Sequence, residues 1–106
     1  MPVRSKTKNT TTRRPTPPGV ILLEEFLKPL GVSQAEAARR MSIPYQRLNE
    51  LVRGERALSP STAVKLAYFL NTTPKFWMNL QIAVTLYDTE KQERTALRKI
   101  SPLKAS

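Results

Sequence analysis

Residues 33 to 54 read SQAEAARRMSIPYQRLNELVRG, and this stretch decides the fold. Its first four residues fit a capping box, in which the Ser33 side chain accepts from the Glu36 amide and the Glu36 side chain returns to the Ser33 amide. A short helix is therefore expected to follow Ser33 and to end near Met41. Ser42 comes next, at a turn position often taken by glycine, because a left-handed backbone costs a residue with a Cβ atom roughly 1 kcal/mol.

The residues after this turn predict a second helix that crosses the first. Pro44 suits the first turn of a helix, where its missing N–H group leaves no partner unsatisfied. Leu48, Leu51 and Val52 then have the spacing of a buried helical face, and Gly54 ends the pattern. Two short helices joined by a turn of about three residues have the geometry of a helix-turn-helix.

Helix start signals predict three further helices around this pair. One opens at residues 16–18 and is expected to end at Pro29 and Gly31, a second opens at residues 59–60, and a third opens at residues 73–74. No segment alternates polar and apolar residues with the period of a strand. The expected fold class is therefore all-α, with five helices.

The net charge is strongly basic and unevenly distributed. Eighteen Lys and Arg against eight Asp and Glu give +10, which is typical of a protein that binds a polyanion. Residues 1–16 carry five basic residues and no acid, with almost no apolar side chains, so we expect a disordered basic arm there. Residues 17–87 form the predicted helix-turn-helix domain. Residues 88–106 are expected to be a polar helical extension and tail, in which Pro102 ends the helix.

The residue types that are missing exclude several classes of function. The chain has no Cys and no His, which removes the commonest general base and most transition-metal ligand sets. We therefore expect no enzyme, no cofactor and no bound metal. No apolar run is long enough to cross a membrane, and the N-terminus lacks the apolar stretch of a signal peptide. These features predict a cytoplasmic protein without a membrane partner.

The outward side of the helix after Pro44 carries side chains that can read double-stranded DNA. Gln and Asn pair with both edge groups of adenine, Arg pairs with those of guanine, and Tyr contacts a thymine methyl group or a phosphate. Gln34 begins the preceding helix, where backbone amides and the helix dipole favour a phosphate. An ordinary solvated face of a helical bundle is the alternative. The predicted DNA-contacting residues are Ser33, Gln34, Arg39, Pro44, Tyr45, Gln46, Arg47, Asn49, Arg53 and Arg56.

The last predicted helix has a wide apolar surface, part of which we expect to meet a second subunit. Two neighbouring stripes follow its start, and both contain bulky side chains. An aromatic pair beside Lys75 also allows a platform on which single-stranded bases stack, although such residues are more often core or interface. The expected homodimer interface consists of Phe76, Trp77, Leu80, Val84 and Tyr87.

Four segments of the sequence carry a more specific resemblance. They read PGVIL at 18–22, EFLKPLGVSQ at 25–34, RLNELVRGER at 47–56 and TPKFWMNLQ at 73–81. Together they resemble the HigA (virulence-associated protein I-like) branch of the lambda repressor/Cro-type, or XRE, family, over about residues 17 to 87. The resemblance implies a five-helix lambda repressor-like fold, base contacts from the start of the helix after Pro44 and a backbone contact from Gln34. Tyr45 and Gln46 lie at positions that vary in the family, so it implies no operator sequence.

The resemblance also implies partners. HigA proteins are antitoxins that bind a small RelE-like (HigB-like) ribosome-dependent endoribonuclease and repress their shared operon as dimers on a palindromic operator. A stand-alone transcription regulator of the same fold and a pure protein-interaction module are the alternatives. A neighbouring reading frame for a small basic RelE-like protein would favour the antitoxin.

Overall fold

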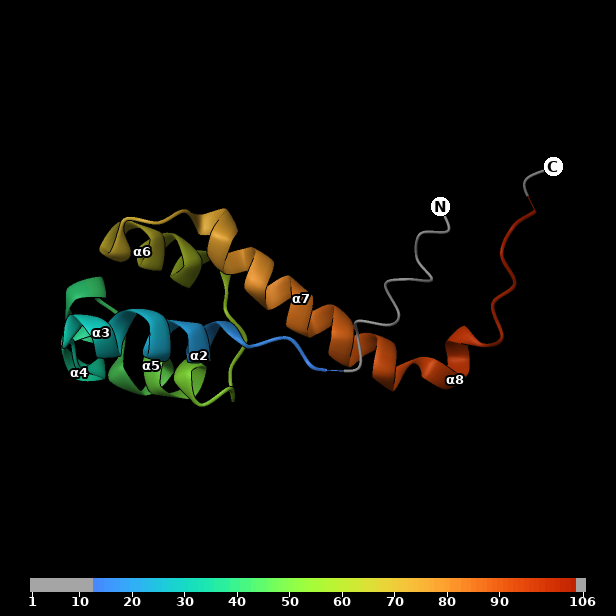
Figure 1. Cartoon of the computed structure of the whole chain (residues 1–106), viewed down its shortest axis with the longest axis horizontal. Coiled ribbons are helices and arrows are strands. Elements are labelled where there is room, and N and C mark those ends of the chain that lie inside the picture. The colour runs from blue at the N-terminus through green and yellow to red at the C-terminus, as the bar shows by residue number, and fades with distance from the viewer. Residues whose placement is uncertain (1–12, 105–106) are drawn as a thin grey trace.

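The described part of the chain, residues 13 to 104 of a computed structural model, is built from helices joined by short turns (Figure 1). Within these residues there is no strand, so the all-α prediction is confirmed. Most of the predicted basic arm, residues 1–12, lies outside the described residues. In chain order the elements are α2 (Pro18–Ile21), the π-helix η1 (Leu22–Leu27), α3 (Lys28–Leu30), α4 (Gln34–Met41), α5 (Tyr45–Val52), α6 (Pro60–Leu70), α7 (Pro74–Gln92) and α8 (Arg94–Leu97).

Three of the predicted helix starts have the expected caps. The side-chain oxygens of Ser33, Ser59 and Thr73 each accept from the backbone amide three residues later, at 3.1, 3.2 and 3.1 Å. These bonds satisfy one of the amides that every helix start leaves without a partner. The second half of the predicted capping box is wrong, because the Glu36 carboxylate turns to Arg39 at 2.8 Å instead of to the Ser33 amide.

The first helical run differs from the sequence prediction at Pro29. Elements α2, η1 and α3 follow one another without a break, so the helix passes through Pro29 and ends at Gly31, whose φ is 67°. The Lys28 amide donates to the Leu23 carbonyl, five residues back, as in a π-helix. A proline inside a helix lacks one donor and crowds the carbonyl four residues earlier. The widened turn before Pro29 relieves that conflict, so proline is tolerated there.

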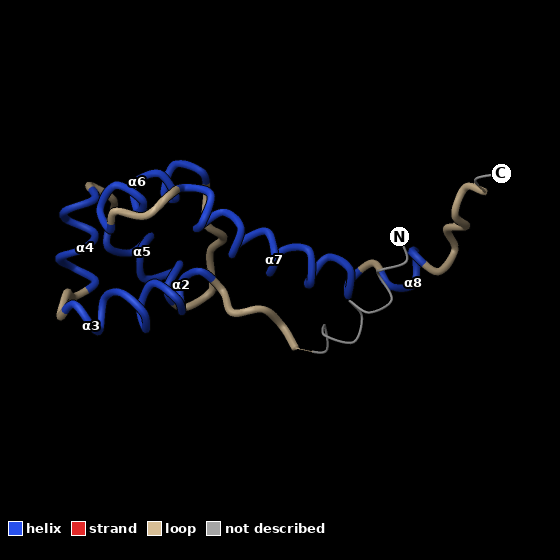
Figure 2. Tube along the Cα trace, turned by 45° about the horizontal axis from the view of Figure 1, so that its top comes forward, coloured by secondary structure: helices blue, strands red, loops and turns tan. Residues whose placement is uncertain are grey.

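The core lies where the first helical run, the helix-turn-helix pair, α6 and the start of α7 meet (Figure 2). Its largest fully buried side chains are Trp77, Leu22, Leu27, Leu48 and Leu66. Gly19 allows α2 to approach α5 closely, since a Cβ atom there would lie 2.0 Å from the Leu51 carbonyl oxygen. This backbone contact fixes α5 against the rest of the domain.

The C-terminal helix continues beyond residue 87 into the segment predicted as a polar helical extension. Helix α7 continues past residue 87 to Gln92 and projects from the bundle, and the short α8 follows as an additional helix (Figure 1). Arg14, near the end of the predicted arm, is joined to Asp88 of α7 by two hydrogen bonds of 2.9 and 2.8 Å. The last residues of that arm are thus held against α7.

Candidate nucleic-acid interface

The turn between α4 and α5 has the left-handed geometry expected at Ser42. Its φ and ψ are 57° and 45°. The amides of Ser42 and Ile43 donate to the carbonyls of Arg39 and Ala38 at 3.2 and 3.0 Å, which satisfies the end of α4. Ala38 of α4 is buried, and its small side chain is suited to the close crossing of the two helices. The predicted helix-turn-helix is confirmed.

Helix α5 separates its buried and exposed side chains as predicted. Leu48, Leu51 and Val52 lie in the core. Their burial leaves the start of the helix pointing outward, with Tyr45, Gln46 and Arg47 exposed. Pro44 is also exposed but stands just before the helix, as its N-cap. The chain therefore presents the first turn of α5 as a polar surface.

Two predicted DNA-contacting residues from different helices meet directly. The Asn49 amide of α5 donates to the Gln34 side-chain oxygen of α4 at 3.0 Å. The Asn49 oxygen in turn accepts from Arg53 at 2.9 Å, and Arg53 pairs with Glu55 at 2.8 Å. This chain of bonds ties the start of α4 to the outward face of α5 and fixes the amide orientations.

Three arginines of this surface are paired with carboxylates. Arg39 pairs with Glu36 at 2.8 Å, Arg53 with Glu55 at 2.8 Å, and Arg56 with Glu50 at 2.9 Å. The hydrogen bond from Arg39 lowers the pKa of Glu36, and that from Arg56 lowers the pKa of Glu50. Both carboxylates therefore stay anionic at neutral pH. The sequence could place these acids near arginines, but it could not select the partners.

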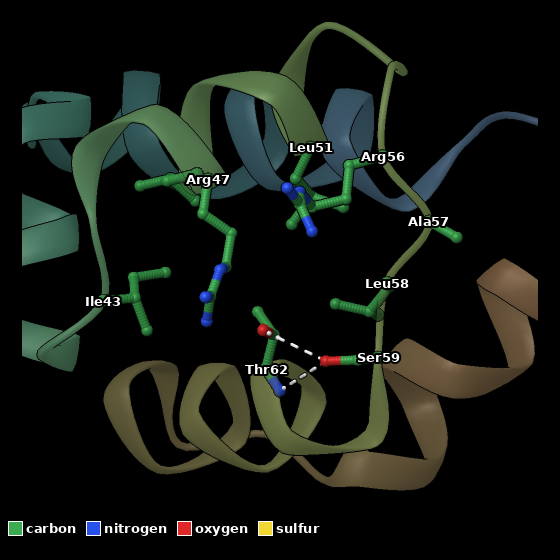
Figure 3. Close-up of a pocket in the computed structure, with 9 residues that line it drawn as sticks. Ile43, Arg47, Leu51, Arg56, Ala57, Leu58, Ser59 and Thr62 are labelled. Atoms are coloured by element: carbon green, nitrogen blue, oxygen red, sulfur yellow. Dashed lines mark hydrogen bonds between the residues drawn. The ribbon is translucent and has the colours of Figure 1, made fainter.

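Arg47 is the exception among the predicted arginines, because the described residues give it no ion pair. Its side chain extends into a pocket of about 90 Å³ between α5 and α6, and Arg56 lies at the same rim (Figure 3). Ser59 and Thr62 are hydrogen-bonded on the opposite wall. The pocket is too small for a cofactor, since ligand pockets hold several hundred Å³. Because Arg47 is exposed and has no ion pair within the described residues, its guanidinium group is available for a partner outside the chain.

Known proteins are similar to this chain in sequence and geometry. A family model described as Helix-turn-helix matches residues 23–77. The chain belongs to the helix-turn-helix family. Within that family it is 40% identical over 84 residues to the uncharacterized HTH-type transcriptional regulator YbaQ of Escherichia coli K12, covering 79% of this chain and 74% of YbaQ.

Antitoxins are among the relatives of this helix-turn-helix protein. It is 37% identical over 93 residues to antitoxin HigA-1 of Vibrio cholerae, covering 88% of each chain. It also matches the solved structure of Pseudomonas aeruginosa antitoxin HigA with the higBA promoter, with a TM-score of 0.82 and 34% identity, covering 86% of this chain and all of that one. The resemblance to the HigA branch and its lambda repressor-like fold is confirmed.

The predicted dimer residues of this helix-turn-helix protein divide into buried and accessible ones. Trp77 and Val84 are 0% and 4% exposed within one protomer, so neither has surface left for a second subunit. That part of the prediction needs correction, because both side chains belong to the protomer's own core. Phe76 is 40% exposed, and Leu80 and Tyr87 are half-buried.

The aromatic cluster at the start of α7 is structural. Trp77 lies 5.0 Å from Phe76 and 5.4 Å from Phe26 between ring centroids, and its indole N–H donates to Thr72 at 2.7 Å. A fully buried ring offers no face to a nucleic-acid base, so Trp77 cannot form the stacking platform considered from the sequence.

Farther along α7, the side chains of Ile82 and Leu86 are exposed. The apolar periodicity of the sequence did not indicate this exposure.

Neither a candidate metal site nor a membrane-spanning helix is found among the described residues. Across residues 13 to 104, no group of three or more His, Cys, Asp or Glu side chains could hold a metal ion. Over the same range, no helix is both long and apolar enough to cross a membrane.

Proposed function

We propose that this chain is a sequence-specific repressor that binds double-stranded DNA as a homodimer, and that it is the antitoxin of a HigBA-type module. The observation that carries this proposal is the outward face of α5, where Gln46, Arg47 and Asn49 stand beside the start of α4. The Pseudomonas HigA structure, which shares this fold over its whole length, is one of the antitoxin with the higBA promoter, and it supports the same role for this chain. In this proposal the chain acts by binding and not by catalysis, and it acts in the cytoplasm.

In this proposal, side chains of α5 contact the bases, and the residues around them contact the DNA backbone. Tyr45, Gln46, Arg47 and Asn49 face the major groove and contact base edges. The residues that surround them position the protein on the sugar-phosphate backbone without reading the sequence. These positioning residues are Ser33, Gln34, Arg39, Pro44, Arg53 and Arg56.

The dimer places two copies of α5 on one face of the DNA. Phe76, Leu80 and Tyr87 of α7 retain surface for a second copy, whereas Trp77 and Val84 support the helix from inside. A twofold dimer reads a palindromic operator whose half-sites lie one helical turn apart, about 34 Å. The predicted partner besides DNA and a second copy is a RelE-like endoribonuclease toxin, which the chain neutralises.

A gel shift with the DNA upstream of the gene tests this proposal most directly. The full chain is expected to retard that fragment, and a footprint is expected to locate two half-sites. Adding the protein encoded by the neighbouring gene is expected to change the shift and to inhibit that protein's RNA cleavage. If Gln46→Ala and Arg47→Ala leave the shift unchanged, the helix-turn-helix is not the reader and the proposal is wrong.

A stand-alone transcription regulator is the second candidate function. It is favoured by the relative YbaQ, which is 40% identical and is described as a transcriptional regulator. The two functions predict the same DNA binding and differ only in the toxin. Copurification of the chain with the product of a neighbouring gene supports the antitoxin, and its failure together with an intact gel shift supports the regulator.

A further inference from the structure

Glu50 occupies a central position on the outward face of α5. Its carboxylate accepts from the Arg56 guanidinium at 2.9 Å and from the Gln46 amide at 3.4 Å. The Glu50 side chain is 24% exposed, against 50% for Arg56, so the carboxylate is the less exposed partner of the pair. One acidic group thus holds a proposed base-reading side chain and a proposed phosphate contact at the same time.

A carboxylate at this place works against DNA binding in general. The hydrogen bond from Arg56, supported by the Gln46 hydrogen bond and the charge of Arg53, lowers the pKa of Glu50. The group is therefore anionic wherever the surface meets phosphates, and like charges brought together cost binding free energy. Glu50 can nevertheless weaken binding to one duplex more than to another, and in that way it can affect the selectivity of DNA binding.

We propose that Glu50 determines the DNA selectivity of this surface, by holding Gln46 and Arg56 in one arrangement and by competing with phosphates for Arg56. This inference rests on the DNA-binding function proposed above. It adds to that function a residue that makes the wrong DNA bind poorly, which is how selectivity is often achieved.

The operator and a non-cognate duplex offer Arg56 the same phosphates and differ in the base edges that they offer Gln46. On any duplex, Arg56 has to leave Glu50 to reach a phosphate, and the carboxylate then faces the backbone without that partner. A non-cognate duplex lacks the base edge that Gln46 pairs with, so no base contact offsets this cost there. At the operator, the orientation of Gln46 that Glu50 maintains is used for a base contact, and less rotamer freedom is lost on binding. Glu50 therefore disfavours non-cognate DNA more than it disfavours the operator.

Glu36 provides the matched control for the substitution of Glu50. Glu36 also pairs with a proposed phosphate contact, Arg39, at 2.8 Å, but it bonds no side chain that reads a base. Replacing Glu36 by Gln removes the same charge at the same surface without disturbing Gln46. Its effect is expected to be the same for every DNA sequence.

Fluorescence anisotropy with the full chain compares the operator duplex found by the footprint with a shuffled duplex of equal length at fixed salt. Glu50→Gln is expected to raise affinity for the shuffled duplex roughly three- to tenfold, the range of one exposed ion pair and one unfavourable charge. Operator affinity is expected to change by less than about threefold, because lost positioning offsets the gain in charge. Glu36→Gln is expected to shift both affinities by the same factor.

A second arm tests whether Glu50 acts through Arg56. Arg56→Ala is measured in the native chain and in Glu50→Gln, and its effect on shuffled-duplex binding is expected to be larger in Glu50→Gln, where Arg56 is released to phosphates. Circular dichroism and a melting curve establish that all variants are folded.

Two results would overturn the inference. A Glu50→Gln effect equal on both duplexes, or absent from both, means that Glu50 contributes charge or nothing, and not selectivity. Additive effects of the two substitutions mean that Glu50 does not act through Arg56. If the native chain binds neither duplex, the DNA-binding function itself fails, which separates the two proposals.

Discussion

The side chains of Gln34 and Asn49 are joined across the two helices of the helix-turn-helix by a hydrogen bond of 3.0 Å. Gln34 begins α4 and Asn49 lies in α5, so the bond connects the group placed for a phosphate with the helix placed for bases. Arg53 extends the connection at 2.9 Å. A change at either amide therefore alters the position of the other.

The first prediction concerns the coupling between these two amides. Gln34→Ala and Asn49→Ala are each expected to weaken operator binding, with a double variant that loses less than the sum of the two. For residues in one hydrogen-bond network, a coupling of roughly 0.5 to 3 kcal/mol is usual. A double-mutant cycle from anisotropy titrations measures it. Strictly additive losses would mean that the two residues bind DNA independently.

The second prediction concerns Arg47, which has no ion pair within residues 13 to 104. Arg47→Ala is expected to weaken operator binding about 5- to 150-fold, the equivalent of one bidentate base contact. The loss is expected to be smaller on a shuffled duplex, where only charge matters. Arg98→Ala, which removes an exposed arginine beyond α8, is the control. Equal losses on both duplexes would assign Arg47 to the backbone instead of to a base.

Local signals explain why the helix starts were predictable. A helix cap joins the hydroxyl oxygen of one residue to the backbone amide three residues later, so it depends only on residues within one turn. Ser33, Ser59 and Thr73 could therefore each be identified as a cap from the sequence alone. The course of the first helix through Pro29 was not predictable in this way. It depends on a π-turn over six residues and on the packing of α2 against α5.

The candidate site was predictable in its faces but not in its pairings. The spacing of Leu48, Leu51 and Val52 already determined which side of α5 points outward. The partners of Glu50 and Asn49 depend on rotamers and on how two helices cross, and neither is encoded in a spacing. For Trp77 the periodicity gave two apolar stripes on one helix, and only the tertiary structure identifies the stripe that the protomer buries itself.

The third prediction concerns the contact between α2 and α5. Gly19→Ala would place a Cβ atom 2.0 Å from the Leu51 carbonyl oxygen and 2.8 Å from the Val52 Cα atom, so α2 must move away. Forcing an extra carbon into a packed contact costs about 1 to 3 kcal/mol of unfolding free energy. The urea midpoint is expected to fall while the m-value stays unchanged.

Gly54→Ala is the matched control for this substitution. A Cβ atom there meets nothing within 4 Å, but its φ of 77° is left-handed. It is expected to cost only the backbone strain, roughly 1 kcal/mol. A Gly19→Ala chain as stable as the native chain would show that α2 is not held by this approach.

The fourth prediction concerns the pH dependence of stability at the Arg14–Asp88 pair. Two hydrogen bonds from Arg14 hold the pKa of Asp88 below its ordinary value of 3.8. A carboxyl whose pKa is lower in the folded chain stabilises the fold above the unfolded pKa, and this contribution is lost as the pH falls through the folded pKa. The native chain should therefore lose stability below about pH 4 that Asp88→Asn does not lose.

Melting temperatures measured from about pH 6 to about pH 3 check this, with Asp88→Asn and Arg14→Ala as a matched pair of variants. Glu36 and Glu50 also have lowered pKa values, so all three proteins share their acid-dependent losses, and only the difference from the native chain reports on Asp88. Because both partners are exposed, added salt should reduce that difference. Parallel melting curves for all three proteins at low salt would mean that the pair does not hold residues 13–16 against α7 in solution.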